Sequence, residues 1–166
     1  REIVPSPPSL DTWISKKEII KRKMINLLGG IPELVDTDVQ VIDEYEGEFY
    51  HRIHLKYSSF DHDEVYAYLL IPKSISEGEK YPAIVAMHQT YNGGKDETVG
   101  ISGNAELAYG VELVKRGYVV LAPDIFAAGE RIPGNIGPYE TSFFYEKYPK
   151  WSAMGKMLYD HMQAVS

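Results

Sequence analysis

The chain has 166 residues, the size of one ordinary domain, and its 24 acidic residues outnumber its 17 basic ones for a net charge of -7. It lacks the clustered positive charge with which proteins bind nucleic acid or anionic membranes. Cysteine is absent, which excludes disulfides and thiolate chemistry, and every apolar run is far shorter than a membrane span. We therefore expect a folded domain with no nucleic acid or membrane partner. The lack of cysteine permits a cytoplasmic location, which is the one we expect.

The first 47 residues lead into the main domain. Prolines at positions 5, 7 and 8 predict an extended arm over residues 1–10, because proline fixes φ and removes a backbone donor. A capping box at 15–18, followed by apolar residues at helical spacing, predicts an amphipathic helix that stops at Gly29 and Gly30. We assign residues 1–47 to the arm, this helix and a lead-in strand, and residues 48–166 to an α/β domain.

The pattern then changes to the period of two that is typical of half-buried strands. Antiparallel strands are predicted at 39–45, 49–57 and 65–71, with Asp61, His62 and Asp63 as a polar turn. The continuous apolar run 81–88 predicts a strand covered on both faces. A helix from Asn104 to Lys115 and a buried strand at 118–123 complete a βαβ unit, so the fold class is α/β with a mixed sheet.

Two segments come after the last predicted strand. The connection from Asp124 to Tyr148 is rich in glycine, proline and aromatic residues, and so long a connection in a compact domain is usually functional. The final helix carries an apolar face that consists of Trp151, Met154, Leu158, Met162 and Val165.

The common chemical motifs are incomplete. A phosphate-binding loop at 92–96 would need glycine at Gln89 and serine or threonine at Asp96. His51 and His54 lie three apart on a strand and project to opposite faces, so we expect both at the surface without a shared metal. The string around Ser102 breaks the G-x-S-x-G pattern at its last position. We therefore predict no metal, no cofactor and no member of a serine triad in this sequence.

A more specific signal starts at His88. A strand ending in His-Gln-Thr-Tyr-Asn-Gly-Gly, followed by a helix and the strand of residues 116–124, resembles the N-terminal half of the α/β-hydrolase fold. More narrowly, the strings Tyr-Leu-Leu-Ile-Pro at 68–72, Ala-Pro-Asp at 122–124 and Gly-Glu-Arg at 129–131 look like the dienelactone-hydrolase and acetyl-xylan-esterase-like branch. The resemblance covers residues 49–166.

The resemblance assigns roles to the loop after this strand. It implies that a backbone N–H of Gln89 or Thr90 belongs to an oxyanion hole, a set of dipoles aimed where negative charge develops on a substrate carbonyl. His88, Gly93 and Gly94 would support the loop. The aromatic residues of the 124–148 connection would either line the pocket or pack in the core; they are Phe126, Tyr139, Phe143, Phe144 and Tyr145.

The resemblance also places the reacting groups outside this sequence. The nucleophile, acid and histidine of a serine hydrolase that acts on small carboxylic esters would lie beyond Ser166, so we expect a truncated fragment that is inactive alone. Truncation would leave the strand ending at His88 with an open edge, which favours self-association. The alternative is a complete, non-catalytic α/β domain that serves in binding or interaction.

Overall fold

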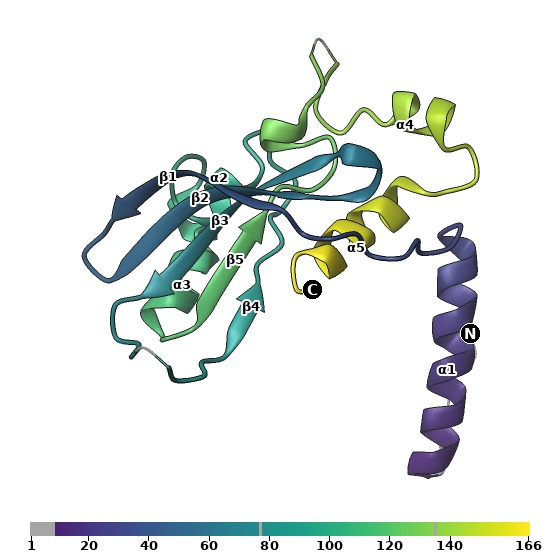
Figure 1. Cartoon of the computed structure of the whole chain (residues 1–166), viewed down its shortest axis with the longest axis horizontal. Helices are drawn as coiled ribbons and strands as arrows, with labels where there is room; N and C mark the ends of the chain where they lie inside the picture. Colours follow the sequence, from purple (N-terminus) through teal and green to yellow (C-terminus); the bar gives the residue numbers. More distant parts are fainter. Residues whose placement is uncertain (1–8, 77, 135) are drawn as a thin grey trace.

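The computed structural model of the protein describes residues 9–76, 78–134 and 136–166, and its centre is one five-stranded sheet (Figure 1). The strand order is β1-β2-β3-β5-β4, in which β4 and β5 are parallel and the other neighbours are antiparallel. This mixed sheet confirms the predicted fold class. The strands are β1 (Val39–Glu46), β2 (Tyr50–Ser58), β3 (Glu64–Pro72), β4 (Ala83–Val85) and β5 (Val119–Pro123).

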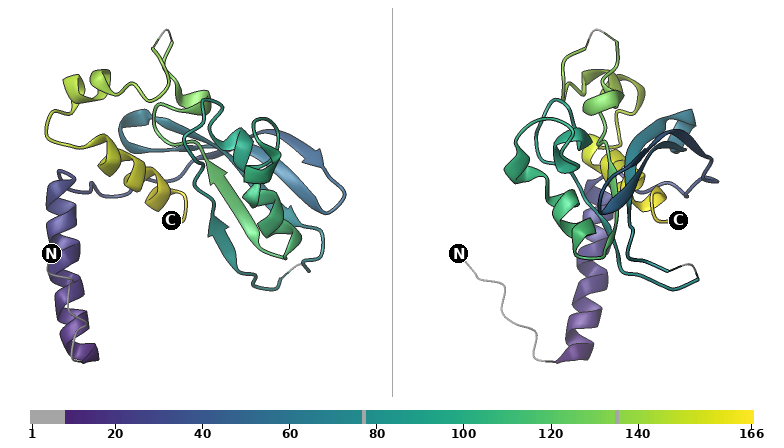
Figure 2. Two further views of the ribbon diagram at one scale, coloured as in Figure 1. Left: turned by 180° about the vertical axis from the view of Figure 1, so that it is seen from behind. Right: turned by 90° about the vertical axis from the view of Figure 1, so that its left-hand side faces the viewer.

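Alternation along β3 supplies apolar residues to both faces of the sheet. Val65 and Ala67 point to one face and pack with β2, whereas Leu70 points to the other face and packs with β5. The α3 helix (Tyr109–Lys115) covers the Leu70 face, and Ala164, just beyond α5 (Ala153–Gln163), packs against the opposite cluster. Figure 2 shows α3 and the carboxyl-terminal helix on opposite sides of the strands. The sheet therefore carries one core cluster on each of its faces.

The β4 strand differs from its prediction. It has only three residues rather than the eight of 81–88, and its first residue, Ala83, is exposed. Within the described part of the chain β4 is hydrogen bonded to β5 alone, so it is an edge strand, as expected for the strand that ends at His88. Its two faces are less covered than the apolar run predicted, because Ile84 and Val85 are only partly buried.

The connection between the parallel strands is also more broken than predicted. Besides the short α2 helix (Lys95–Thr98), it contains a 3-10 turn, η2 (Ala105–Leu107), and then α3. Asn104 does cap the first turn, since its side chain accepts the Glu106 N–H at 3.1 Å. Ala108 interrupts the helix with ψ of 49°, so one predicted helix becomes two pieces.

The α1 helix (Leu10–Leu27) begins earlier than the capping box indicated. Ser9 is its N-cap and accepts the Thr12 N–H at 3.2 Å, so the extended arm does not reach Leu10; residues 1–8 lie outside the described part. No α1 residue is buried, and Figure 1 shows the helix standing apart from the sheet. Its apolar side faces an open groove that it shares with Leu158 and Met162. No helix in the described part of the chain is long and apolar enough to span a membrane.

The face that α5 buries is not the predicted apolar one. Met154 and Val165 are 63% and 69% exposed, and Leu158 and Met162 are exposed as well. The prediction holds for Trp151, which is buried. The α5 residues that point into the molecule are largely polar: Lys156, Tyr159, Asp160 and Gln163.

Candidate functional site

The predicted oxyanion loop, residues 88–94, leaves the end of β4 and is held first by His88. The His88 ring is buried, its Nε2 accepts the Ile125 N–H at 3.1 Å, and its Nδ1 lies 2.7 Å from the Gln89 carbonyl oxygen. Because Nε2 accepts, the proton is on Nδ1, which donates to Gln89. The neutral ring therefore ties the start of the loop to the segment after β5.

Gln89 and Thr90 stand at the exposed part of this loop. The Gln89 side chain turns back and donates to the Glu97 carboxylate on α2, so it does not project from the loop. Within the described residues, neither the Gln89 nor the Thr90 backbone N–H donates a hydrogen bond. Both backbone amides are thus without a hydrogen-bond acceptor among the described residues.

Gly94 is required where the loop enters α2. Its φ is +57°, and a Cβ built there would lie 2.1 Å from Asp124 Oδ1. Gly129 has the same φ, and its Cβ would lie 2.2 Å from the same oxygen. Gly93 is less constrained, because its Cβ would meet side chains alone, the Tyr91 ring and the Ser102 hydroxyl. The 88–94 loop and the segment around Gly129 therefore both pack closely against one carboxylate.

That carboxylate belongs to Asp124, which lies directly after β5 and is 1% exposed. Its Oδ1 accepts the Lys95 backbone N–H at 2.8 Å, and its Oδ2 accepts the Lys95 ammonium at 2.8 Å and the Glu130 N–H at 3.0 Å. Asp124 has no role in the predictions made from sequence. The sequence feature that could have revealed this residue is an aspartate at the end of a buried strand, followed by Gly-Glu-Arg at 129–131.

Lys95 links the Asp124 carboxylate to a second carboxylate, that of Glu130. Burial acts to lower the pKa of Lys95, but the Asp124 and Glu130 carboxylates outweigh burial, and the pKa is raised. Glu130 also contacts His54 Nε2 at 2.8 Å, and His54 Nδ1 lies 3.2 Å from Asp43 on β1. His54 is buried, so the expectation that it lies at the surface is wrong: its two carboxylate partners come from distant segments.

His51 does lie on the partly exposed side of β2. Its Nε2 is 2.9 Å from a Glu44 carboxylate oxygen. In the part of the chain that the structure describes, no group of three or more carboxylate or imidazole side chains is arranged to hold a metal ion.

A second buried ion cluster joins α5 to the turn between β2 and β3. Arg131 lies 2.6 Å from Asp63 and 2.9 Å from Asp160, and Lys156 lies 2.7 Å and 2.5 Å from the same two carboxylates. The charged residues of α5 are buried because this cluster pairs them. The cluster ties the segment after β5, through Arg131, to α5 and to the turn between β2 and β3.

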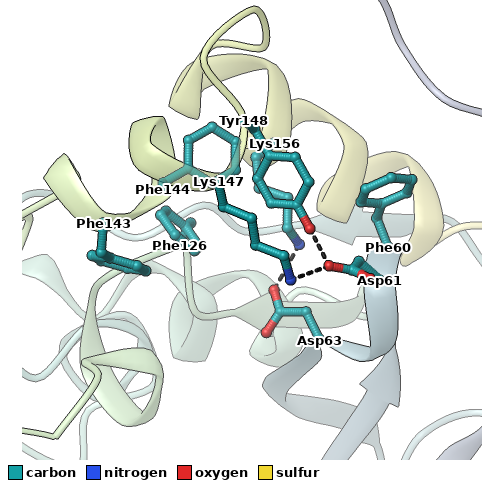
Figure 3. Close-up of a pocket in the computed structure, with 9 residues that line it drawn as sticks. All are labelled: Phe60, Asp61, Asp63, Phe126, Phe143, Phe144, Lys147, Tyr148 and Lys156. Carbon is teal, nitrogen blue, oxygen red and sulfur yellow. Dashed lines mark hydrogen bonds and ion pairs between the residues drawn. The ribbon is translucent and has the colours of Figure 1, made fainter.

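Three of the five aromatic residues expected in a pocket do line one cavity. Phe126, Phe143 and Phe144 gather around it, together with Tyr148 (Figure 3). The cavity includes no residue of the 88–94 loop, so it is not continuous with the candidate oxyanion site. Phe126 and Phe144 are also buried core residues, so core packing is confirmed for these two, whereas a place in the pocket of the oxyanion loop stays a prediction.

The other two aromatic residues serve different contacts. Tyr139 reaches the candidate loop itself: its hydroxyl accepts the Tyr91 N–H at 2.6 Å and donates to the Tyr91 carbonyl at 2.7 Å. Tyr145 is exposed, and its hydroxyl accepts the Ala153 N–H at 3.2 Å. Tyr139 thus joins the 124–148 connection to the 88–94 loop by hydrogen bonds.

Three solved structures have a fold similar to that of this chain. A provisionally assigned acetyl xylan esterase from Bacteroides fragilis superposes with a TM-score of 0.77 at 22% identity, covering 98% of this chain and 44% of that chain. Acetyl xylan esterase 1 from Thermoanaerobacterium sp. gives 0.55 at 15% identity with 98% and 46% coverage, and the Paenibacillus sp. R4 acetyl xylan esterase gives 0.52 at 15% with 99% and 47%. No protein-family model and no curated protein matches the sequence.

The sheet and its βαβ unit therefore define an α/β-hydrolase-type fold, as predicted from the loop and strand motifs. More narrowly, the three structures named above are acetyl xylan esterases, the first of them by provisional assignment. The chain spans less than half of the length of each of these neighbours.

Proposed function

We propose that this chain forms the amino-terminal part of a hydrolase that cleaves carboxylic esters. Support comes from the acetyl xylan esterases that share its fold and from the fact that it aligns with under half of each. The observation that carries the proposal is the pair of free amides at Gln89 and Thr90, at the carboxyl end of a parallel strand.

In the proposed reaction these amides act on the substrate carbonyl. A serine oxygen bonds to the acyl carbon while histidine takes its proton; the ester C–O bond then breaks, and the alcohol leaves with that proton. Water releases the acid from the acyl-enzyme. The Gln89 or Thr90 N–H stabilises the negative charge on the carbonyl oxygen during both steps. We place the serine, histidine and acid beyond Ser166.

The first test compares this chain with the longer gene product. Hydrolysis of an aryl acetate is measured for both, and we expect turnover in the longer protein alone. A serine-inhibitor-sensitive rate in the 166-residue chain would contradict the placement of the nucleophile. If neither protein hydrolyses a panel of short acyl esters and the codons after Ser166 encode no G-x-S-x-G, the non-catalytic binding domain becomes the better interpretation.

A second test identifies the donating amide in the longer protein. Thr90→Pro removes the backbone N–H of that residue, whereas Thr90→Ala keeps it, and Gln89→Pro and Gln89→Ala form the matching pair. Loss of an oxyanion donor lowers kcat by about 10²–10³ fold with little change in KM. We expect this loss in one proline variant and in neither alanine variant. Equal kcat in all four would remove the oxyanion role from this loop.

A further inference from the structure

A cavity of about 250 Å³ opens between the η1 turn (Phe60–His62), which joins β2 to β3, and α4 (Ser142–Lys147) (Figure 3). Engineered apolar cavities of ~150 Å³ hold benzene, so this one has room for a single substituted ring. Five aromatic side chains surround it: Phe60, Phe126, Phe143, Phe144 and Tyr148.

The rings of this cavity are fixed by the core. Phe126 and Phe144 are 8% and 3% exposed, with ring centroids 5.1 Å apart and planes at 62°. Tyr148 lies 5.1 Å from Phe144 at 45°, and Phe60 lies 5.9 Å from Tyr148 at 65°. Tilted rings present both edges and faces to the space between them, an arrangement that favours an aromatic guest.

The polar groups at the cavity are balanced in charge. Lys147 and the Tyr148 hydroxyl both donate to Asp61 Oδ2, as the dashed lines in Figure 3 show, and Lys156 pairs with Asp63 at 2.7 Å. Two carboxylates face two ammonium groups, so a charged guest would bring an unmatched charge out of water. The cavity therefore suits a neutral molecule.

One oxygen at the cavity has no donor among the described residues. Asp61 Oδ1 accepts no hydrogen bond from any of them, whereas Oδ2 accepts two, and the side chain is 37% exposed, so Oδ1 is open to a donor from outside the protein. Asp61 and His62 have consecutive φ values of 60° and 61°, which Asp and His adopt more readily than most other non-glycine residues, so the η1 turn can hold this carboxylate at the cavity.

We propose that this cavity is a binding site for a small neutral phenol, whose ring lies among the five aromatic side chains and whose hydroxyl donates to Asp61 Oδ1. The site contains no residue of the 88–94 loop, so it goes beyond the proposed ester hydrolysis and does not depend on it.

Binding is measured directly on the 166-residue chain by calorimetry and by NMR titration. The probes are phenol, toluene, which lacks the hydroxyl, cyclohexanol, which lacks the aromatic ring, and benzoate, which adds charge. We expect saturable phenol binding at least tenfold tighter than that of the other three, with shifted resonances at Phe143 and Lys147. Equal affinity for phenol and cyclohexanol, stronger binding of benzoate, or shifts confined to other regions would overturn the proposal.

Variants separate the hydroxyl contact from ring packing. Asp61→Asn keeps the side-chain shape at a left-handed position, where asparagine is tolerated, but removes the charge that strengthens the hydrogen bond. We expect about a tenfold loss in phenol affinity, equivalent to about 1.4 kcal/mol, and no change for toluene. Glu146→Gln, on the exposed side of α4, serves as the control and should leave both affinities unchanged. Unchanged phenol affinity in folded Asp61→Asn would refute the hydroxyl contact.

Discussion

The Lys95 ammonium lies 2.8 Å from Oδ2 of Asp124, and both side chains are almost wholly buried. The same carboxylate also accepts two backbone N–H groups, one from the entry of α2 and one from Glu130. A single side chain at the end of β5 therefore holds the candidate oxyanion loop and the Gly-Glu-Arg segment in one arrangement.

Asp124→Asn should be strongly destabilising, because it removes a wholly buried carboxylate from the Lys95 charge and leaves it with Glu130, which is partly exposed, and with Asp96 at 4.0 Å. Removal of one member of a buried pair typically costs about 3–5 kcal/mol. Urea unfolding gives the free energy. Glu112→Gln, which removes an exposed partner of Lys115, is the control and should change stability by less than about 1 kcal/mol. Similar values for the two variants would contradict the role of Asp124.

Gly94→Ala tests the close approach of the loop to this carboxylate. Gly94 has φ +57° and ψ −125°, a combination that L-residues rarely adopt, so any side chain there costs about 1–3 kcal/mol. The added Cβ must also displace Asp124 Oδ1, a further cost of about 1–3 kcal/mol. Gly117→Ala is the control at another position of positive φ, +88°, where no described atom lies within 4 Å of the added Cβ. Urea midpoints should fall much further for Gly94→Ala. Equal losses would show that only the backbone conformation matters.

Acid should weaken the fold through Asp63. Burial acts to raise the pKa of Asp63, but Arg131 and Lys156 outweigh it and the pKa is lowered. A carboxyl whose folded pKa lies below its unfolded value of about 3.9 adds stability above that pH, and this stability is lost as pH falls through the folded pKa. Unfolding free energies between about pH 7 and about pH 2.5 should therefore drop below about pH 4.

Asp63→Asn isolates this contribution. Asp96 has a pKa raised by burial, so its effect on stability has the opposite sign. The difference between wild type and Asp63→Asn at each pH removes that background. We expect the difference to be largest at neutral pH and to shrink below about pH 4; a constant difference would exclude linkage through Asp63.

The two edge strands of the sheet, β1 and β4, differ in how well they are protected against pairing with a strand of another chain. We expect copies of the chain to associate through the less protected strand, β4. The β1 edge carries Asp43 and Glu44 and an irregularity in register, whereas β4 is Ala-Ile-Val. Ala86 donates to β5, so the Val85 N–H points to the open side. Light scattering should show mass increasing with concentration for wild type and for Val85→Ala, but not for Val85→Pro. Association that persists in Val85→Pro would move the interface elsewhere.

Much of the sheet is predictable from local pattern. The strands β1, β2 and β3 match their predicted ranges to within a residue or so, because alternating polarity selects a half-buried strand wherever it occurs. The place of Gly93 and Gly94 in the loop after β4 and the α/β fold class were likewise predicted from the sequence. These features depend on residues that lie close together along the chain.

The face buried by α5 was decided by tertiary structure alone. Periodicity indicated that Met154, Leu158, Met162 and Val165 would be buried, yet the helix turns its charged side inward. Lys156 and Asp160 can be buried there only because Asp63 and Arg131, from distant segments, pair with them. A charge costs too much to bury alone, and its partner is chosen by the fold, so no pattern within one helix can reveal it.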